Sequence, residues 1–146
     1  MYKVIVVGTD GSDRATVAVR EALELAKMAG ATLHAVQVVH PAVKTGFSDT
    51  SGGQFEIDKM REQAERTGAR LLAESEQLGV STEIHTPAGT DVADALISVA
   101  EAVHADLVVV GNLGMSGMKR LVLGSVPNKV SHHCPCSLLI VDTEAT

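Results

Sequence analysis

Short apolar runs alternate with helix-length amphipathic stretches along the whole chain. Four runs rich in β-branched or apolar residues span 2–8, 31–39, 105–111 and 136–141, and a weaker, more alternating run that suits an edge spans 80–86. Continuous apolar strands are typical of a parallel sheet buried on both faces, and strands that alternate with helices favour the same arrangement. We therefore predict one α/β domain over residues 1–146, with helices on both faces of a parallel sheet.

The stretches between the runs carry apolar residues at steps of three and four, which indicate amphipathic helices. These helices are expected at about 13–29, 54–78 and 90–103. A fourth should begin near Ser125, which is a good N-cap and has Pro127 in its first turn. Other helix ends are expected at Ser12 or Asp13, Gly30 and Gly79. The apolar stripes are Ala18, Ala22, Leu25 and Ala29 in the first helix, Ile57, Met60, Ala64, Leu71 and Leu78 in the second, and Val92, Ala95, Leu96, Val99 and Val103 in the third.

Charge and composition exclude several classes of partner. Twelve basic against 18 acidic residues give a net charge of −6, which argues against a nucleic-acid or anionic-membrane binder. Tyr2, Phe47 and Phe55 are too few to stack single-stranded bases. No run approaches the roughly 18 apolar residues of a membrane span, and the N-terminal run suits a first strand better than a signal peptide. Two close cysteines, Cys134 and Cys136, agree with a reducing compartment, so we expect a cytoplasmic protein.

The segment 40–53 is polar, contains glycine and has no periodicity, so it is interpreted as a long loop after the second strand. Loops of this length in compact domains are often functional. The sequence leaves two alternatives open for it: a lid over a site, or a surface excursion.

Two strands end in the same way. VIVVGTDG at 4–11 and LVVVGNLG at 107–114 are both apolar runs that end in Gly-x-x-Gly. In a doubly wound sheet, the two strands at the reversal of strand order open a crevice at their carboxyl ends, where ligands bind. We therefore expect the first and fourth strands to lie side by side, with Gly8 and Gly111 at the crevice.

Glycines continue beyond the fourth strand, at Gly114, Gly117 and Gly124, and Ser125 follows the last of them. Glycine lets backbone N–H groups approach a ligand closely, and a helix that begins nearby favours an anion. The chain lacks the Gly-Lys-Ser/Thr ending of a P-loop, so a phosphate here would be held by backbone amides and a helix end. The alternative is that these glycines only turn the strand into the helix.

The spacing of Gly111, Gly114, Gly124 and Ser125 forms the pattern G-x2-G-x9-G-[ST]. This pattern resembles the phosphate loop of the ATP-binding branch of the universal stress protein family. The resemblance extends to GTDGS after the first strand, the long loop after the second, and the ending CPCSLLIV. It covers essentially the whole chain.

The resemblance implies a Rossmann-like, doubly wound sheet of five parallel strands in the order 3-2-1-4-5, and a homodimer formed through the last strand. It also implies a stress-response sensor or regulator that binds ATP, or AMP, ADP or cyclic AMP, with Mg²⁺ accompanying ATP. Asp10 and Val39 would lie toward ribose and base. The Asp10 carboxylate would accept hydrogen bonds from ribose hydroxyls or an adenine amino group, and Val39 would pack on the base while its backbone groups read the base edge. The alternatives are a turn or cap residue for Asp10 and an ordinary core residue for Val39. The remaining implied nucleotide-binding residues are Gly8, Gly111, Gly114, Met115, Gly117, Gly124, Ser125 and Val126.

One departure concerns the triphosphate. Family members that bind ATP often carry a basic or polar residue between the first two glycines, whereas this chain has Asn112 and the uncharged Leu113. The cations that remain are Lys119, Arg120 and Lys129, which are otherwise solvated surface charges. We expect an adenine nucleotide to bind without a strong preference for the triphosphate.

The sequence leaves three other functions to consider: an enzyme, a metal site and a nucleotide-independent interaction module. The sequence shows no pair of a nucleophile and a base, because His132 and His133 lie about two helical turns beyond Ser125. We therefore assign no catalytic residue. If the protein has an enzymatic activity, we expect no more than slow ATP hydrolysis. The soft ligands at 132–136 lack the second, separated pair that zinc sites use, so no metal site is assigned. A nucleotide-independent dimeric interaction module is the third, and the retained glycine loop counts against it. In either case the apolar terminal strand 136–141 would be covered in a homodimer.

Overall fold

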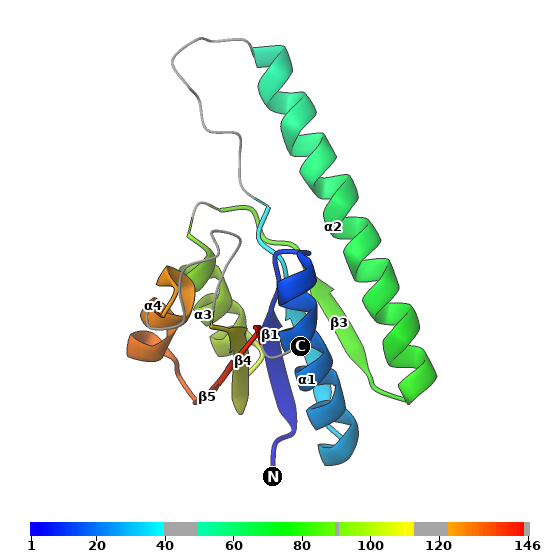
Figure 1. Ribbon diagram of the computed structural model, residues 1–146, viewed down its shortest axis with the longest axis vertical. Helices are drawn as coiled ribbons and strands as arrows, with labels where there is room; N and C mark the ends of the chain where they lie inside the picture. The colour runs from blue at the N-terminus through cyan, green and yellow to red at the C-terminus, as the bar shows by residue number, and fades with distance from the viewer. Residues whose placement is uncertain (40–49, 90, 113–122, 145–146) are drawn as a thin grey trace.

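The computed structural model of the chain describes residues 1–39, 50–89, 91–112 and 123–144, and for residues 50–53 it describes the backbone only. Its five strands form one parallel sheet in the order β3-β2-β1-β4-β5, which confirms the expected fold (Figure 1). The weaker run becomes the edge strand β3, and β1 and β4 lie side by side as predicted. The elements in chain order are β1 (Val4–Gly8), α1 (Asp13–Ala29), β2 (Thr32–Val36), α2 (Thr50–Leu78), β3 (Thr82–His85), α3 (Val92–Ala102), β4 (Leu107–Gly111), α4 (Ser125–His133) and β5 (Ser137–Val141).

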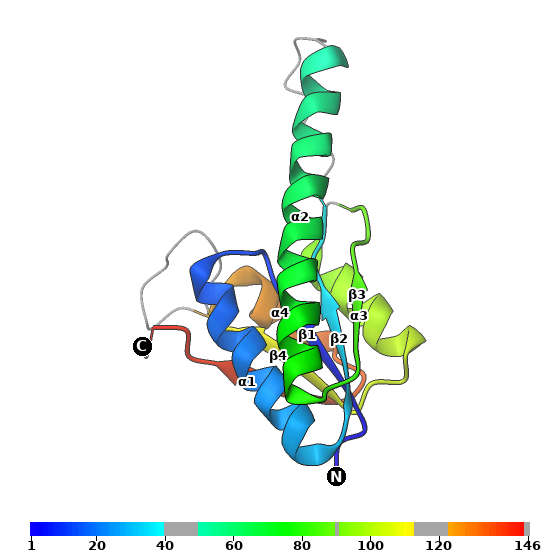
Figure 2. The same ribbon diagram turned by 90° about the vertical axis from the view of Figure 1, so that its right-hand side faces the viewer.

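Two hydrophobic layers sandwich the sheet. On one face, side chains of α1 and α2 pack against alternate residues of β1, β2 and β4. On the other face, α3 and α4 pack against the intervening strand residues (Figures 1 and 2). The upper part of α2 extends well past the end of the sheet (Figure 2). Within the described residues, no helix combines the length and the apolar character that crossing a membrane would take.

Local capping explains where α1 begins and ends. The Ser12 side chain accepts a hydrogen bond from the Ala15 N–H at 3.2 Å, so Ser12 is the N-cap. Gly30 ends the helix in the left-handed region with φ 65°, where a Cβ would cost energy, and its N–H group caps carbonyls of the last turn. Both capping predictions are confirmed.

The buried face of α1 differs from the predicted stripe. Ala18 and Ala22 are buried as expected, but Leu23 at 1% exposure, not Leu25, is the leucine at the centre of the contact with the sheet. Leu25 is only partly buried beside this core. Two overlapping apolar stripes share Ala18 and Ala22, and the helix turns the stripe with Val19 and Leu23 inward because it buries the larger side chains.

Two helix starts also differ from the prediction. Gly124, not Ser125, is the N-cap of α4, and Ser125 is already helical. The Gly124 N–H donates to the Asn112 carbonyl at 3.0 Å, and a Cβ at 124 would lie 3.1 Å from that oxygen, so the close approach favours glycine at the cap. Helix α2 begins at Thr50 rather than at 54. The prediction placed its start too late because Gly52 and Gly53 are weak helix formers, which made this segment resemble the loop.

Candidate functional site

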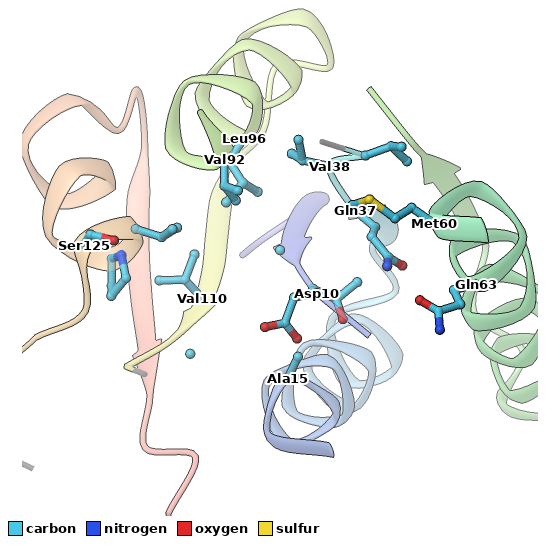
Figure 3. A pocket seen from close by; sticks show the side chains of 16 residues that line it. Asp10, Ala15, Gln37, Val38, Met60, Gln63, Val92, Leu96, Val110 and Ser125 are labelled. Atoms are coloured by element: carbon cyan, nitrogen blue, oxygen red, sulfur yellow. The ribbon is translucent and has the colours of Figure 1, made fainter. Parts of the chain in front are cut away.

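A cavity of about 450 Å³ opens at the carboxyl ends of β1, β2 and β4 (Figure 3). This is where the strand order reverses, between β1 and β4. Its volume falls within the usual range for small-ligand sites, about 300–1,000 Å³. The lining residues are Gly8, Thr9, Asp10, Ala15, Gln37, Val38, Val39, Met60, Gln63, Val92, Leu96, Val110, Gly111, Ser125, Val126 and Pro127.

Residues predicted from four separate parts of the chain meet at this cavity. Six of the ten predicted site residues line it, namely Gly8, Asp10, Val39, Gly111, Ser125 and Val126. Gly124 borders it as the N-cap of α4. The other three, Gly114, Met115 and Gly117, lie outside the described residues, as do Leu113, Lys119, Arg120 and the loop at 40–49.

The N-terminus of α4 supplies an anion-binding end. The N–H groups of the first helical turn have no carbonyl within the helix to bind, and the helix dipole adds positive potential there. Ser125 and Val126 carry two such N–H groups at the cavity, whereas Pro127 has none. Ser125 also lines the cavity with its side chain, and its hydroxyl can donate and accept hydrogen bonds.

Asp10 both closes a turn and lines the cavity, so it matches its predicted position at the site and its alternative as a turn residue. Its Oδ1 accepts a hydrogen bond from the Ser12 N–H at 2.9 Å, which closes the turn before α1. Its Oδ2 has no partner among the described residues, and the carboxylate points into the cavity (Figure 3). Within the described chain it is also the only ionisable side chain in the lining, which suits recognition of hydroxyl or amino donors better than acid–base catalysis with a second group.

Val39 corrects one expectation. A base edge was expected to be read by its backbone groups, but they form a parallel bridge to the segment after β3. The Val39 N–H donates to the Pro87 carbonyl at 3.0 Å, and the Val39 carbonyl accepts from the Gly89 N–H at 3.2 Å. Val39 therefore contributes apolar surface, and its N–H is not available to a ligand.

The sequence interpretation missed the polar groups on the opposite wall. The amides of Gln37, just after β2, and Gln63, on α2, line the cavity near Met60 (Figure 3). Both amides can donate and accept hydrogen bonds, as recognition of a base edge requires. Gly11, in the left-handed region with φ 77°, leaves room for Gln37, since a Cβ there would lie 3.3 Å from Gln37 Nε2. Only the position of Gln37 next to a strand end could have suggested it.

A family model described as the universal stress protein family matches residues 1–142. The chain belongs to this family. It is 32% identical over 142 residues to universal stress protein MJ0531 of Methanocaldococcus jannaschii. This alignment covers 97% of the present chain and 82% of that protein.

Solved universal stress proteins share the fold. UspA from Lactobacillus plantarum superposes with a TM-score of 0.87 at 22% identity, covering 96% of this chain and 97% of that one. A universal stress protein crystallised in complex with cAMP is 32% identical, with a TM-score of 0.73 and coverage of 97% and 98%. The first likeness supports the fold, and the second links a related sequence to an adenine nucleotide.

Lys129 of this universal stress protein lies on α4, the helix whose first turn lines the cavity, and its ammonium group is already paired. Lys129 Nζ lies 2.7 Å from Asp91 Oδ2 and 3.0 Å from Asp94 Oδ1. The hydrogen bond to Asp91 raises the pKa of Lys129 and lowers that of Asp91. Lys129 therefore links α4 to the start of α3 through an ion pair that stays partly exposed to solvent.

The histidines and cysteines at 132–136 include two free thiols close together. Cys134 and Cys136 are half-buried free thiols at the junction of α4 and β5, with their sulfur atoms 4.0 Å apart. Burial raises the pKa of Cys136 to about 12, so its metal-binding thiolate is scarce at neutral pH. Among the described residues, three ligand atoms that could hold a metal converge elsewhere, at His34, Glu83 and His85.

Proposed function

We propose that this universal stress protein binds an adenine nucleotide in the cavity and regulates a stress response through that binding. One observation carries the proposal: an apolar wall, a carboxylate and a helix N-terminus meet in one cavity at the reversal of strand order. A base would pack on the apolar wall, ribose hydroxyls would donate to Asp10, and a phosphate would accept from the N–H groups of Ser125 and Val126. The similarity to a family member crystallised with cAMP supports this assignment.

We further propose that the site does not strongly prefer the triphosphate. Lys129 is held by two carboxylates, and Leu113 brings no charge to the glycine loop. A triphosphate carries more negative charge than the amides of one helix end neutralise, so Mg²⁺ would accompany ATP. AMP, ADP and cyclic AMP need fewer countercharges, and we expect them to bind at least as well as ATP.

A thermal-shift panel with ATP, ADP, AMP, cyclic AMP and GTP, each with and without Mg²⁺, tests both proposals. A ligand at about 100 times its dissociation constant adds about 2.7 kcal/mol to the stability of the folded state. For a chain of this length that is a rise of several degrees in Tm. We expect such a rise with adenine nucleotides, with AMP and cyclic AMP equal to or above ATP.

Protein freed of any co-purified nucleotide must be used, because a retained ligand would mask the shift. If no nucleotide raises Tm in that preparation, the nucleotide proposal fails and a dimeric interaction module becomes the better reading of the fold. A shift confined to ATP with Mg²⁺ would overturn only the ranking.

We also propose a symmetric homodimer across β5. This strand lies at the edge of the sheet, and its inner side is paired with β4 through residues up to Val141, whose carbonyl accepts from the Asn112 N–H at 2.9 Å. Because strand residues alternate, Ile140 directs its N–H and carbonyl away from β4, toward the open edge. A second copy would pair these groups and cover an edge that otherwise invites aggregation.

Light scattering on Ile140→Pro and Ile140→Ala tests the dimer. Both variants lose the isoleucine side chain, but only proline removes the outward N–H group, at an edge position where proline is tolerated. We expect the proline variant to be monomeric and the alanine variant to remain dimeric. A monomeric parent protein, or a dimeric proline variant, would refute pairing through β5.

A further inference from the structure

Two imidazoles and a carboxylate gather on one face of the sheet where β2 and β3 run side by side. In the register, His34 of β2 pairs with Glu83 of β3, and Val36 pairs with His85. Alternate residues of a strand point to the same face, so His34, Glu83 and His85 share the face of Val36, which packs with α3. Almost fifty residues separate the two strand segments, so no short motif reveals the group.

The three side chains already direct ligand atoms at one another. His34 Nδ1 lies 2.9 Å from His85 Nε2 and 3.6 Å from Glu83 Oε2, and all three ligand atoms lie within 4.8 Å of one another. A tetrahedral zinc ion with ligands at about 2.0–2.1 Å holds neighbouring ligand atoms about 3.3 Å apart. A small widening between the rings and an inward move of the carboxylate would reach that geometry.

The three side chains differ in burial: His34 lies inside the protein, where its ring is held in place, and Glu83 lies at the surface, where it can move. The His34 side chain is 9% exposed, which fixes its ring, whereas the Glu83 side chain is 65% exposed and can swing inward. His85 is half-buried. Such a site is preorganised on two hydrogen-bonded strands yet open on one side for entry of an ion.

The contact between the two rings also suits a metal. His34 Nδ1 and His85 Nε2 face each other directly at 2.9 Å. Two ring nitrogens in such a contact can share one proton in one hydrogen bond, whereas a bound cation accepts a lone pair from each of them.

We propose that His34, Glu83 and His85 form a binding site for a divalent first-row transition-metal ion, with zinc as the best match and water at the open position. Two imidazoles and one carboxylate are a ligand set that zinc uses, whereas Mg²⁺ and Ca²⁺ prefer oxygen ligands throughout. This proposal departs from the sequence-based expectation of no metal site, which considered only ligands close together in the chain. It does not depend on nucleotide binding.

Calorimetric titration of the untagged, metal-free full chain with zinc chloride tests the site. We expect one zinc ion per chain. His85→Ala and Glu83→Gln should each weaken binding by about tenfold or more, because even groups outside the ligand shell change metal affinity by about 10–100-fold. Glu83→Gln is the gentler variant, since the side chain is mostly exposed and keeps its size.

His132→Ala is the matched control, because it removes an exposed histidine beside the two thiols. Zinc affinity should be unchanged in this variant. Cobalt in place of zinc should give a tetrahedral absorption spectrum without the charge-transfer band of a thiolate ligand. The proposal is overturned if the parent protein binds no zinc, if both β3 variants bind it as tightly as the parent, or if binding disappears in His132→Ala.

Discussion

Ser125→Asp is expected to remove the nucleotide-dependent rise in Tm while leaving the ligand-free protein at least as stable as the parent. The new carboxylate would stand at the first residue of α4, where negative charge interacts favourably with the helix dipole. The same charge would repel a phosphate bound to the N–H groups of that turn. At about 4 Å the repulsion ranges from about 1 kcal/mol in water to about 4 kcal/mol near a protein surface. A loss of about fivefold or more in affinity follows, since every 1.4 kcal/mol is about tenfold.

Ser131→Asp is the matched control for this experiment. It makes the same substitution at an exposed position on the same helix, but near the end away from the cavity. It should lower the stability of the free protein slightly, since negative charge is unfavourable at a helix C-terminus, and leave nucleotide affinity unchanged. Equal losses of affinity in both variants would show that the net charge of the protein, not the position of the carboxylate, weakens binding. Undiminished binding in Ser125→Asp would refute the proposal that the phosphate binds at the N-terminus of α4.

Leu23→Ala is expected to reduce the free energy of unfolding by about 2–5 kcal/mol. Leu23 is 1% exposed in the layer between α1 and the sheet, where it packs among residues of β1, β2 and β4. Truncation loses the transfer free energy of the side chain and leaves a cavity that a layer of small aliphatic residues closes poorly. Denaturant unfolding followed by circular dichroism measures the change.

Leu25→Ala, two residues along the same helix, separates the observed buried face from the predicted one. Leu25 is only partly buried, so its truncation should cost clearly less than that of Leu23. Both substitutions place the same residue in the interior of the same helix, so the difference in helix propensity cancels. A larger loss at Leu25 than at Leu23 would mean that α1 presents the stripe expected from the sequence.

The strands were the most predictable part of the fold. Each of the five apolar runs contains one strand, with ends trimmed by one or two residues for most strands and by more where β2 turns toward Val39. The family resemblance carried the full strand order, and the repeated Gly-x-x-Gly ending placed β1 beside β4. Helix boundaries and faces were less certain, because overlapping apolar stripes and glycine-containing turns allow more than one local solution.

The candidate site was predictable where a motif marks it. Glycines and the helix start after β4 carry a spacing that can be recognised in the chain, so Gly111 and Ser125 were placed at the cavity in advance. Gln37 and Gln63 carry no such signal, since glutamines after a strand and on a helix are ordinary surface residues by sequence alone. The backbone pairing of Val39 could not be predicted either, because its partner segment follows β3 and lies far from Val39 in the sequence.

Neighbours along the chain were thus enough to establish the alternation of strands and helices, the caps of α1, and the positions of Gly111 and Ser125 at the cavity. These features depend on periodicity and on residues a few positions apart. Contacts between distant segments settled the rest: the inward face of α1, the cap of α4 against Asn112, the pairing of Lys129 with Asp91, and the meeting of His34 with Glu83 and His85. Those outcomes depend on packing and register across the sheet, which local periodicity does not encode.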